Sequence, residues 1–438
     1  MGSASLSFSI VNFVKATIGS GILGLPYAYS QMGLLLGTIL ILFCGVVQAL
    51  AIHFLALFVM QENKRGRGIS FKSLAHSAFN GHRFATGLVS ASEILSTVGT
   101  TTGYLIVIGD LVPEVCEYFG AHRWFLISRM FWITIIGWCI LLPMSLPSNV
   151  DSLKVSSLIG IVGIVYTTVV IMLFSFGMID LPQPKQVVSF WPPEESDFTS
   201  LPGMMQSFPI FIFAFACSIN VPALVVELDA LTLRRADIMM FLGLGCCTAI
   251  YMLVGICGSI AFGASVEGDS LKSFPKGEGT IGGLLSTIGR VAIVANVMGG
   301  IPLKIHPLRA AVSPLLFGKE STELRMSVRT SLTIVLFGIS WLLALVITNL
   351  DEVMAFIGST ANMVTGFSLP ALFYCYGMNR GANDTEEDFG IQESPAIGGS
   401  RSRKAGWMRN LARVMAVVSL VLVPVLLSGE VVKIIGHE

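Results

Sequence analysis

Charged residues are scarce in this chain. Only 12% of its 438 residues are Asp, Glu, Lys or Arg, whereas 53% are hydrophobic. Soluble domains usually carry about 25% charged residues. A chain so poor in charge cannot cover itself with a soluble surface, so most of it must face lipid or other helices. The formal net charge of zero gives no argument for a nucleic-acid partner, and we expect none.

The sequence also lacks the patterns of enzyme and metal sites. Its eight cysteines are scattered, without the spacing of metal ligands. It has no G-x-S-x-G or H-E-x-x-H motif and no phosphate-binding loop. The basic and apolar pattern of a cleaved signal peptide is also absent from the start. We therefore predict a protein that is not an enzyme and needs no metal or cofactor.

Long apolar runs dominate instead. A membrane-spanning helix needs about 20 apolar residues. Eleven runs approach or exceed that length: 7–30, 34–60, 84–112, 124–143, 153–178, 203–228, 238–262, 281–305, 328–349, 352–376 and 408–429. The sequence thus predicts an all-α integral membrane protein with eleven transmembrane helices. Residues 377–405 are polar, glycine-rich and of mixed charge, so we expect a disordered cytoplasmic loop there.

The Lys and Arg residues predict the orientation. Eleven spans put the two termini on opposite sides of the membrane. If the N-terminus is cytoplasmic, most Lys and Arg residues fall in cytoplasmic loops, as the positive-inside rule requires. We expect a cytoplasmic N-terminus, a non-cytoplasmic C-terminus and a non-cytoplasmic loop at 179–202. The sequon at Asn383 would then stay unmodified.

The first span is interrupted. Its stretch "KATIGSGILGLPYA", residues 15–28, places three glycines and a proline in an apolar run. Such a break at membrane depth frees backbone groups, and it is tolerated where it is buried in protein or lines a cavity. The alternative is a close helix–helix contact through the small residues.

A second interruption occurs five spans later. The stretch "SFPIFIFAFACSINVPALVVEL", residues 207–228, carries Pro209, Ser218, Asn220 and Pro222 in an otherwise apolar run. Interruptions at matching positions of two halves are a sequence indicator of a transporter site. We therefore predict two inverted repeats, spans one to five within 1–178 and spans six to ten within 203–376. Span eleven and the tail, 406–438, lie outside the repeat.

The two breaks predict where a zwitterion would bind. The N-terminus of a half-helix presents free N–H groups to a carboxylate, whereas carbonyl ends attract an ammonium group. The predicted carboxylate site is the backbone of Gly19, Ser20, Gly21 and Ile22. The predicted ammonium site is the backbone around Phe215, Ala216, Cys217 and Ser218, with Asn220 beside it.

Four stretches resemble a known family. "NFVKATIGSGILGLPYA" resembles the first span of the amino acid/auxin permease family, which includes sodium-coupled neutral amino acid transporters and proton-coupled vacuolar and lysosomal transporters. "FAFACSINVPALVVELDALTLRR", "GGIPLKIHPLRAAV" and "FIGSTANMVTGFSLPALFYCY" resemble its sixth, eighth and tenth spans. The resemblance covers nearly the whole chain. It implies the five-plus-five inverted repeat of LeuT-like transporters, with discontinuous helices 1 and 6 and an additional helix 11.

The resemblance also implies amino acid substrates, alternating access, and a vacuolar, lysosomal or plasma membrane. Two positions depart from the sodium-coupled branch. Lys15 stands where that branch has an asparagine of the sodium site, and Gly300 lies where it has a threonine. The proton-coupled relatives commonly have a lysine at the first position. The resemblance thus favours proton-coupled or sodium-independent transport over the sodium-coupled alternative, and a sensor that binds an amino acid without moving it is the second alternative.

Charges inside the spans are candidates for coupling, because such charges are rare and usually functional. Lys15 and Glu93 lie at similar depths and are able to pair, so we predict an ion-coupling site of Lys15, Glu93 and Gly300. The alternatives are a permanent structural pair, and an ammonium that stands in place of sodium. Lys304 is expected to snorkel from the end of span eight. The small residues near both breaks favour small or medium neutral substrates.

Overall fold

The computed structural model describes residues 4–121, 123–147, 154–179, 181, 190–191, 201–263, 266–276, 280–378 and 398–436. Side chains are described for all of these except 154–159, 201–206, 398–405 and 430–436. Within these residues every named element is helical, and the β-structure is one isolated bridge between Ala4 and Leu228. Most of the predicted loops 179–202 and 377–405, with Asn383, lies outside the described residues.

Seven helical segments among the described residues are long and apolar enough to cross a membrane. They are α3 (Leu34–Lys64), α5 (Arg83–Tyr118), the segment Ser207–Val226, α12 (Leu233–Phe262), α13 (Ile281–Leu316), α14 (Met326–Val346) and Gly406–Gly429 within α17 (Gly398–Gly436). An eighth consists of α1 (Leu6–Thr17) and α2 (Gly21–Met32), which are bent by 58° at a short break. The protein is thus an all-helical, multi-pass membrane protein over the part of the chain that the structure describes.

The remaining predicted spans coincide with shorter or interrupted helices. Span four corresponds to α7 (Arg129–Ile136), the π-helix η1 (Gly137–Leu141) and α8 (Leu142–Ser145), and span five to α9 (Lys154–Ser175). Span ten starts with α15 (Leu350–Ile357) and continues through the π-helices η6 (Gly358–Asn362) and η7 (Val364–Ser368). Length and composition therefore support eight spans directly, and the number eleven stays a prediction.

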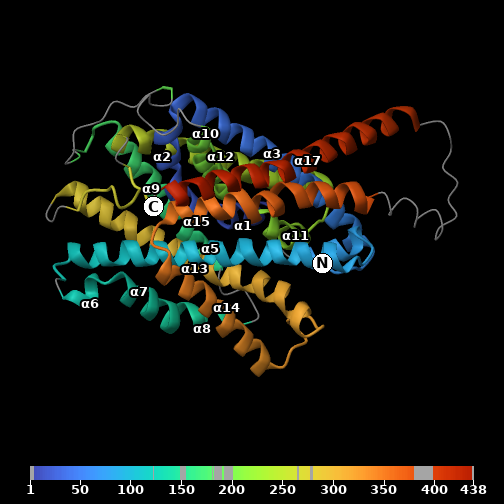
Figure 1. Ribbon diagram of the computed structural model, residues 1–438, viewed down its shortest axis with the longest axis horizontal. Coiled ribbons are helices and arrows are strands. Elements are labelled where there is room, and N and C mark those ends of the chain that lie inside the picture. Colours follow the sequence, from blue (N-terminus) through green and yellow to red (C-terminus); the bar gives the residue numbers. More distant parts are fainter. Residues whose placement is uncertain are drawn as a thin grey trace.

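Two faces of the helical bundle serve as references for the site. The N-terminal face is where α1 begins, α3 ends and α5 begins; the opposite face is where α2 and α5 end and α13 begins. On the N-terminal face the Ala4 backbone bonds to the Glu227 carbonyl and the Asp229 amide, both at 3.0 Å. Figure 1 shows α5 running along the long axis between these two faces. Short surface helices, α4 (Phe71–Ala78) and α6 (Trp124–Ile127), flank the two ends of α5.

Helix α12 and helix α13 hold the interior together. Helix α12 packs against α1, α2, α3 and α9, whereas α13 packs against α5 and α9. Glycines allow these close approaches, for example Gly255 of α12 against the ring of Tyr29. The outer surfaces are apolar as well, because α3 exposes Leu42, Phe43 and Val46. Exposed aliphatic rows on long helices are what a lipid-facing surface requires.

Candidate functional site

The two predicted breaks are present and are joined by one tyrosine. Helix α1 ends at Thr17, and α2 begins at Gly21; α10 (Leu201–Ala214) is followed by an irregular turn, the 3₁₀-helix η4 (Ser218–Asn220) and α11 (Val221–Val226). The Oη atom of Tyr251 on α12 lies 3.2 Å from the Thr17 carbonyl oxygen and 2.7 Å from that of Ala214. One buried phenol therefore caps the carbonyl ends of both broken helices.

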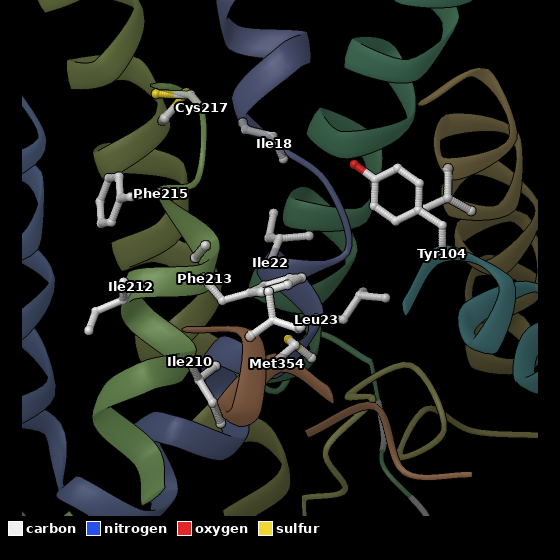
Figure 2. Packing of buried hydrophobic residues seen from close by; sticks show 14 of the residues in the cluster. Ile18, Ile22, Leu23, Tyr104, Ile210, Ile212, Phe213, Phe215, Cys217 and Met354 are labelled. Carbon is white, nitrogen blue, oxygen red and sulfur yellow. The ribbon is translucent and has the colours of Figure 1, made fainter. Parts of the chain in front are cut away.

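The glycines of the first break make close contacts. A β-carbon at Gly21 would lie 2.7 Å from the Cα atom of Ala214, so Gly21 packs directly on α10. Gly19 faces the hydroxyl end of the Tyr104 ring with no room for a β-carbon. Figure 2 shows Ile18 and Ile22 of this break between the segment Phe213–Cys217 and Tyr104. Close packing, the alternative interpretation of the glycines, thus accounts for Gly21, and it leaves the predicted carboxylate site untested.

Polar groups at the start of α2 are unpaired. The Ser20 side chain does not cap α2, and its buried Oγ atom has no hydrogen-bond partner. The first N–H groups of a helix have no partner within that helix. The backbone of Gly21 and Ile22 therefore directs N–H groups into the break beside an unused hydroxyl. This is the local chemistry that a carboxylate requires.

The second break is fixed by a polar side chain of α3. Gln48 donates from Nε2 to the Oγ atom of Ser218 at 2.8 Å and to the Sγ atom of Cys217 at 3.6 Å. Ser218 in turn donates to the Gly366 carbonyl oxygen at 3.3 Å. Phe215 is buried, and its ring meets the Tyr251 ring edge-on at 5.2 Å. Gln48 was not among the residues predicted from the sequence, although a buried glutamine in an apolar run is a detectable signal.

A narrow pocket lies between the second break and helices α5 and α13. Its lining is Ser96, Thr97, Thr100, Ala216, Ser218, Ile219, Asn220, Lys304, Pro307, Thr365 and Gly366. Ser218 and Asn220 are thus predicted site residues that border the pocket. The residues of the first break, with Phe215 and Cys217, are not part of this lining.

Lys15 contacts helix α13 rather than Glu93. Its Nζ atom donates to the Asn296 carbonyl oxygen at 2.8 Å and also to Oδ1 of the same residue. Gly160 of α9 makes room for this ammonium group. Glu93 is only 4% exposed, its Oε2 atom has no hydrogen-bond partner, and no ion pair joins it to Lys15. The structure therefore does not contain the predicted pair of Lys15 and Glu93.

Gly300 is covered by Tyr104. A β-carbon at Gly300 would lie 2.7 Å from the Cε2 atom of the Tyr104 ring. The same ring reaches Gly19 of the first break, so Tyr104 fills the space between α13 and that break. Tyr104 was missed at the level of sequence, because one tyrosine in an apolar span has no distinguishing pattern.

Lys304 lies at the pocket. It is partly buried on α13 and lines the pocket opposite Ser218 and Asn220. Its ammonium group makes no hydrogen bond or ion pair with any described residue. The expectation that Lys304 snorkels stays a prediction, although α13 continues past it to Leu316 and its side chain lines the pocket.

The opposite face is closed by ion pairs. Asp110 of α5 pairs with Lys272 at 2.9 Å and with Arg129 at 3.4 Å. Glu114, one turn further, pairs with Lys276 at 2.8 Å and with Arg290 at 2.7 Å. These contacts tie the loop 266–276 to helices α5, α7 and α13.

The same loop reaches the first turn of α2, where the Ser270 amide donates to the Leu23 carbonyl oxygen at 3.2 Å. Asp269 of this loop is buried and accepts a hydrogen bond from the Leu271 amide at 3.0 Å. Burial, and then the neighbouring Asp110 carboxylate, raise the pKa of Asp269 to about 7. A titratable carboxyl group is therefore built into the closed side of the bundle.

The amino-acid sequence matches a family of known proteins. The family model described as "Transmembrane amino acid transporter protein" matches residues 2–389. "Vacuolar amino acid transporter 5" of Schizosaccharomyces pombe is 28% identical over 377 residues, which cover 86% of this chain and 85% of that protein. "Vacuolar amino acid transporter 6" of Saccharomyces cerevisiae is 25% identical over 416 residues, covering 84% and 89%. "Putative sodium-coupled neutral amino acid transporter 10" of Xenopus laevis is 26% identical over 384 residues, covering 83% of this chain and 34% of that protein.

Proposed function

Because the chain belongs to the family of transmembrane amino acid transporter proteins, we propose that it is a secondary active transporter that moves amino acids by alternating access. The observation that carries the proposal is the pair of broken helices, α1/α2 and α10/α11, held together at their carbonyl ends by Tyr251. Broken helices that meet at mid-membrane supply backbone donors and acceptors where lipid supplies none.

The proposed architecture is an eleven-span, LeuT-like fold. Each half opens with an interrupted helix: α1/α2 starts the first repeat of five spans, within residues 1–178, and α10/α11 starts the second, within 203–376. Helix α17 is the additional span; it already begins at Gly398, before the predicted boundary at 406. In this proposal the N-terminal face is cytoplasmic. The membrane is a vacuolar, lysosomal or plasma membrane, and the names of two relatives support the vacuolar assignment.

The proposed substrate site uses both breaks. The carboxylate of the amino acid binds the N–H groups at the start of α2, next to the unpaired Ser20 hydroxyl. Its ammonium group binds acceptors of the second break near Ser218 and Asn220, which border the pocket. Tyr104, in contact with Gly19, is added to the residues predicted from the sequence.

Sodium-independent transport is the proposed mode of coupling. The Lys15 ammonium group binds two oxygens of Asn296, which are groups that a sodium ion would otherwise use. Two unit charges about 4 Å apart repel by several kcal/mol at a low effective dielectric constant. The Tyr104 ring against Gly300 leaves no room for the threonine of the sodium-coupled branch. Glu93, buried and without a hydrogen-bond partner at Oε2, is the proposed proton carrier.

Uptake by purified protein in liposomes tests the proposal. A panel of twenty labelled amino acids is offered under an imposed pH gradient, with protein-free liposomes as control. We expect accumulation of at least one amino acid that persists when sodium is replaced by choline and changes with external pH. Uptake that collapses in choline and ignores pH would support sodium coupling instead. Saturable binding without uptake would support the sensor.

A further inference from the structure

Lys304 is the one charged side chain among the residues that line the pocket. The other ten lining residues are serine, threonine, asparagine or uncharged apolar residues. The lining therefore carries a positive charge and no negative charge to balance it. An ammonium group that is partly buried and has no partner is poorly solvated, so the site favours a ligand that brings an anion.

The neighbouring charges do not neutralise Lys304. Lys15 is a second cation close enough to repel it. Glu93 lies one turn before the lining residue Thr97, and it makes no ion pair with Lys304. Among the described residues, Lys304 thus has no carboxylate within ion-pair distance.

The hydroxyl groups of the pocket are oriented away from an anion. The Thr97 hydroxyl donates to the Glu93 carbonyl oxygen at 2.7 Å, and the Thr100 hydroxyl donates to that of Ser96 at 2.7 Å. The Ser218 hydroxyl donates to Gly366. Since these hydrogens are already used, the three hydroxyl groups have none to offer an anion, and Lys304 is left as the strong donor of the site.

We propose that Lys304 selects amino acids that carry a carboxylate in the side chain, that is, the dicarboxylic amino acids. The inference rests on the proposed transport function and names its substrate class. The α-carboxylate is assigned to the start of α2, so the side-chain carboxylate is the group left to pair with Lys304. This assignment replaces the preference for neutral substrates that the small residues at the breaks suggested.

Glutamate and glutamine are the best pair of probes, because they have the same shape and differ in the charge of the side chain. In the wild-type protein we expect glutamate uptake to exceed glutamine uptake. A hydrogen bond to a charged group is worth enough for a preference of about tenfold to a hundredfold. Lys304→Met should remove most of this preference and keep glutamine uptake, whereas Lys304→Arg should retain it.

Lys319→Met is the matched control, since Lys319 is exposed just beyond the end of α13. It should leave the glutamate-to-glutamine ratio at the wild-type value. Equal uptake of both probes by the wild-type protein overturns the inference, as does an equal loss of both in Lys304→Met. If Lys304→Met does not fold, the inference is tested by the glutamate-to-glutamine uptake ratios of the wild-type protein and of Lys304→Arg. Transport of neutral amino acids only would reject this inference and leave the proposed function standing, whereas no uptake of any amino acid would reject both.

Discussion

Lys15 and Asn296 lie 281 positions apart in the sequence and are joined in the interior of the helical bundle by two hydrogen bonds from one ammonium group. The pair links the first broken helix to α13, with α9 packed alongside. Because Lys15 is only 5% exposed, its charge depends on these two oxygens for solvation. Removing Asn296 and removing Lys15 should therefore affect the stability of the protein differently.

Asn296→Leu should destabilise the protein more than Lys15→Met. The first substitution leaves a buried ammonium group with a single backbone acceptor, and an unsatisfied charged group costs more than an unsatisfied neutral one. The second leaves a neutral amide unpaired, which costs about 1–3 kcal/mol. Thermal unfolding of the two variants and of the double variant, in one detergent, measures the coupling. Additive shifts in the double variant would mean that the two side chains do not interact.

Glu93→Gln should flatten the dependence of uptake on external pH while the protein still folds. The substitution keeps the size of the side chain and removes its titratable group, and no ion pair is broken, since Glu93 has none among the described residues. Initial uptake rates over a range of pH values provide the measurement. Glu323→Gln, an exposed position on the N-terminal face, is the control. A Glu93→Gln protein with the wild-type pH profile would remove Glu93 from the coupling mechanism.

Gly300→Ala should lower stability by about 1–3 kcal/mol, the usual cost of overpacking a core. The new methyl group would meet the Tyr104 ring at 2.7 Å. Gly338→Ala is the matched control, because a β-carbon there meets nothing within 4 Å. Adding Tyr104→Ala to Gly300→Ala should relieve the collision, whereas Tyr104→Phe should not, because the ring carbons remain. Equal melting temperatures for Gly300→Ala and Gly338→Ala would show that the Tyr104 ring moves aside without loss of stability.

Asp269 should make the protein less stable as the pH rises. Its pKa in the folded state is about 7, above the ordinary value of 3.8. The folded state thus holds a proton that the unfolded state releases between about pH 4 and pH 7, so stability falls over this range as pH increases. The surrounding charges are Asp110 and Glu114 of α5, Arg290 of α13, and Lys272 and Glu267 of the loop.

Asp269→Asn tests this assignment, since the amide oxygen is still able to accept from Leu271. We expect the variant to be more stable than the wild type at pH 8 by up to a few kcal/mol, and the difference to vanish near pH 4. Glu323→Gln, an exposed position outside this loop, should behave as the wild type. Parallel stability curves for wild type and Asp269→Asn from pH 4 to pH 8 would exclude a raised pKa at Asp269.

The interruptions were readable from the sequence because they depend on local composition. Gly19 and Gly21 disfavour continuous helix at the first break, and Pro222 stands in the first turn of α11, whereas Pro209 lies within α10 and does not interrupt it. The breaks accordingly fall at Ile18–Ser20 and at Phe215–Cys217, where they were expected. The helix ends were less predictable, since α5 and α13 continue well past their predicted spans. Polar residues beyond the membrane extend a helix as readily as apolar ones.

The contacts of the charged residues could not be predicted from local composition. Depth along a span comes from counting residues, and that count placed Lys15 level with Glu93. Which face of the helix a side chain occupies depends on how the helices are rotated against each other. The structure turns Lys15 toward Asn296, and turns Lys304 into the pocket. A single sequence carries no signal for either rotation.

The Tyr251 hydroxyl group has one hydrogen to donate and two carbonyl acceptors within reach. This imbalance limits how strongly the tyrosine opposes a separation of the two broken helices. A phenol donates one full hydrogen bond at a time. When one helix end draws away, the hydrogen stays with the other, so their separation loses no more than about one hydrogen bond, roughly 0.5–1.5 kcal/mol. The phenol therefore holds the two carbonyl ends together while opposing their separation only weakly, which is what the proposed alternating access would require.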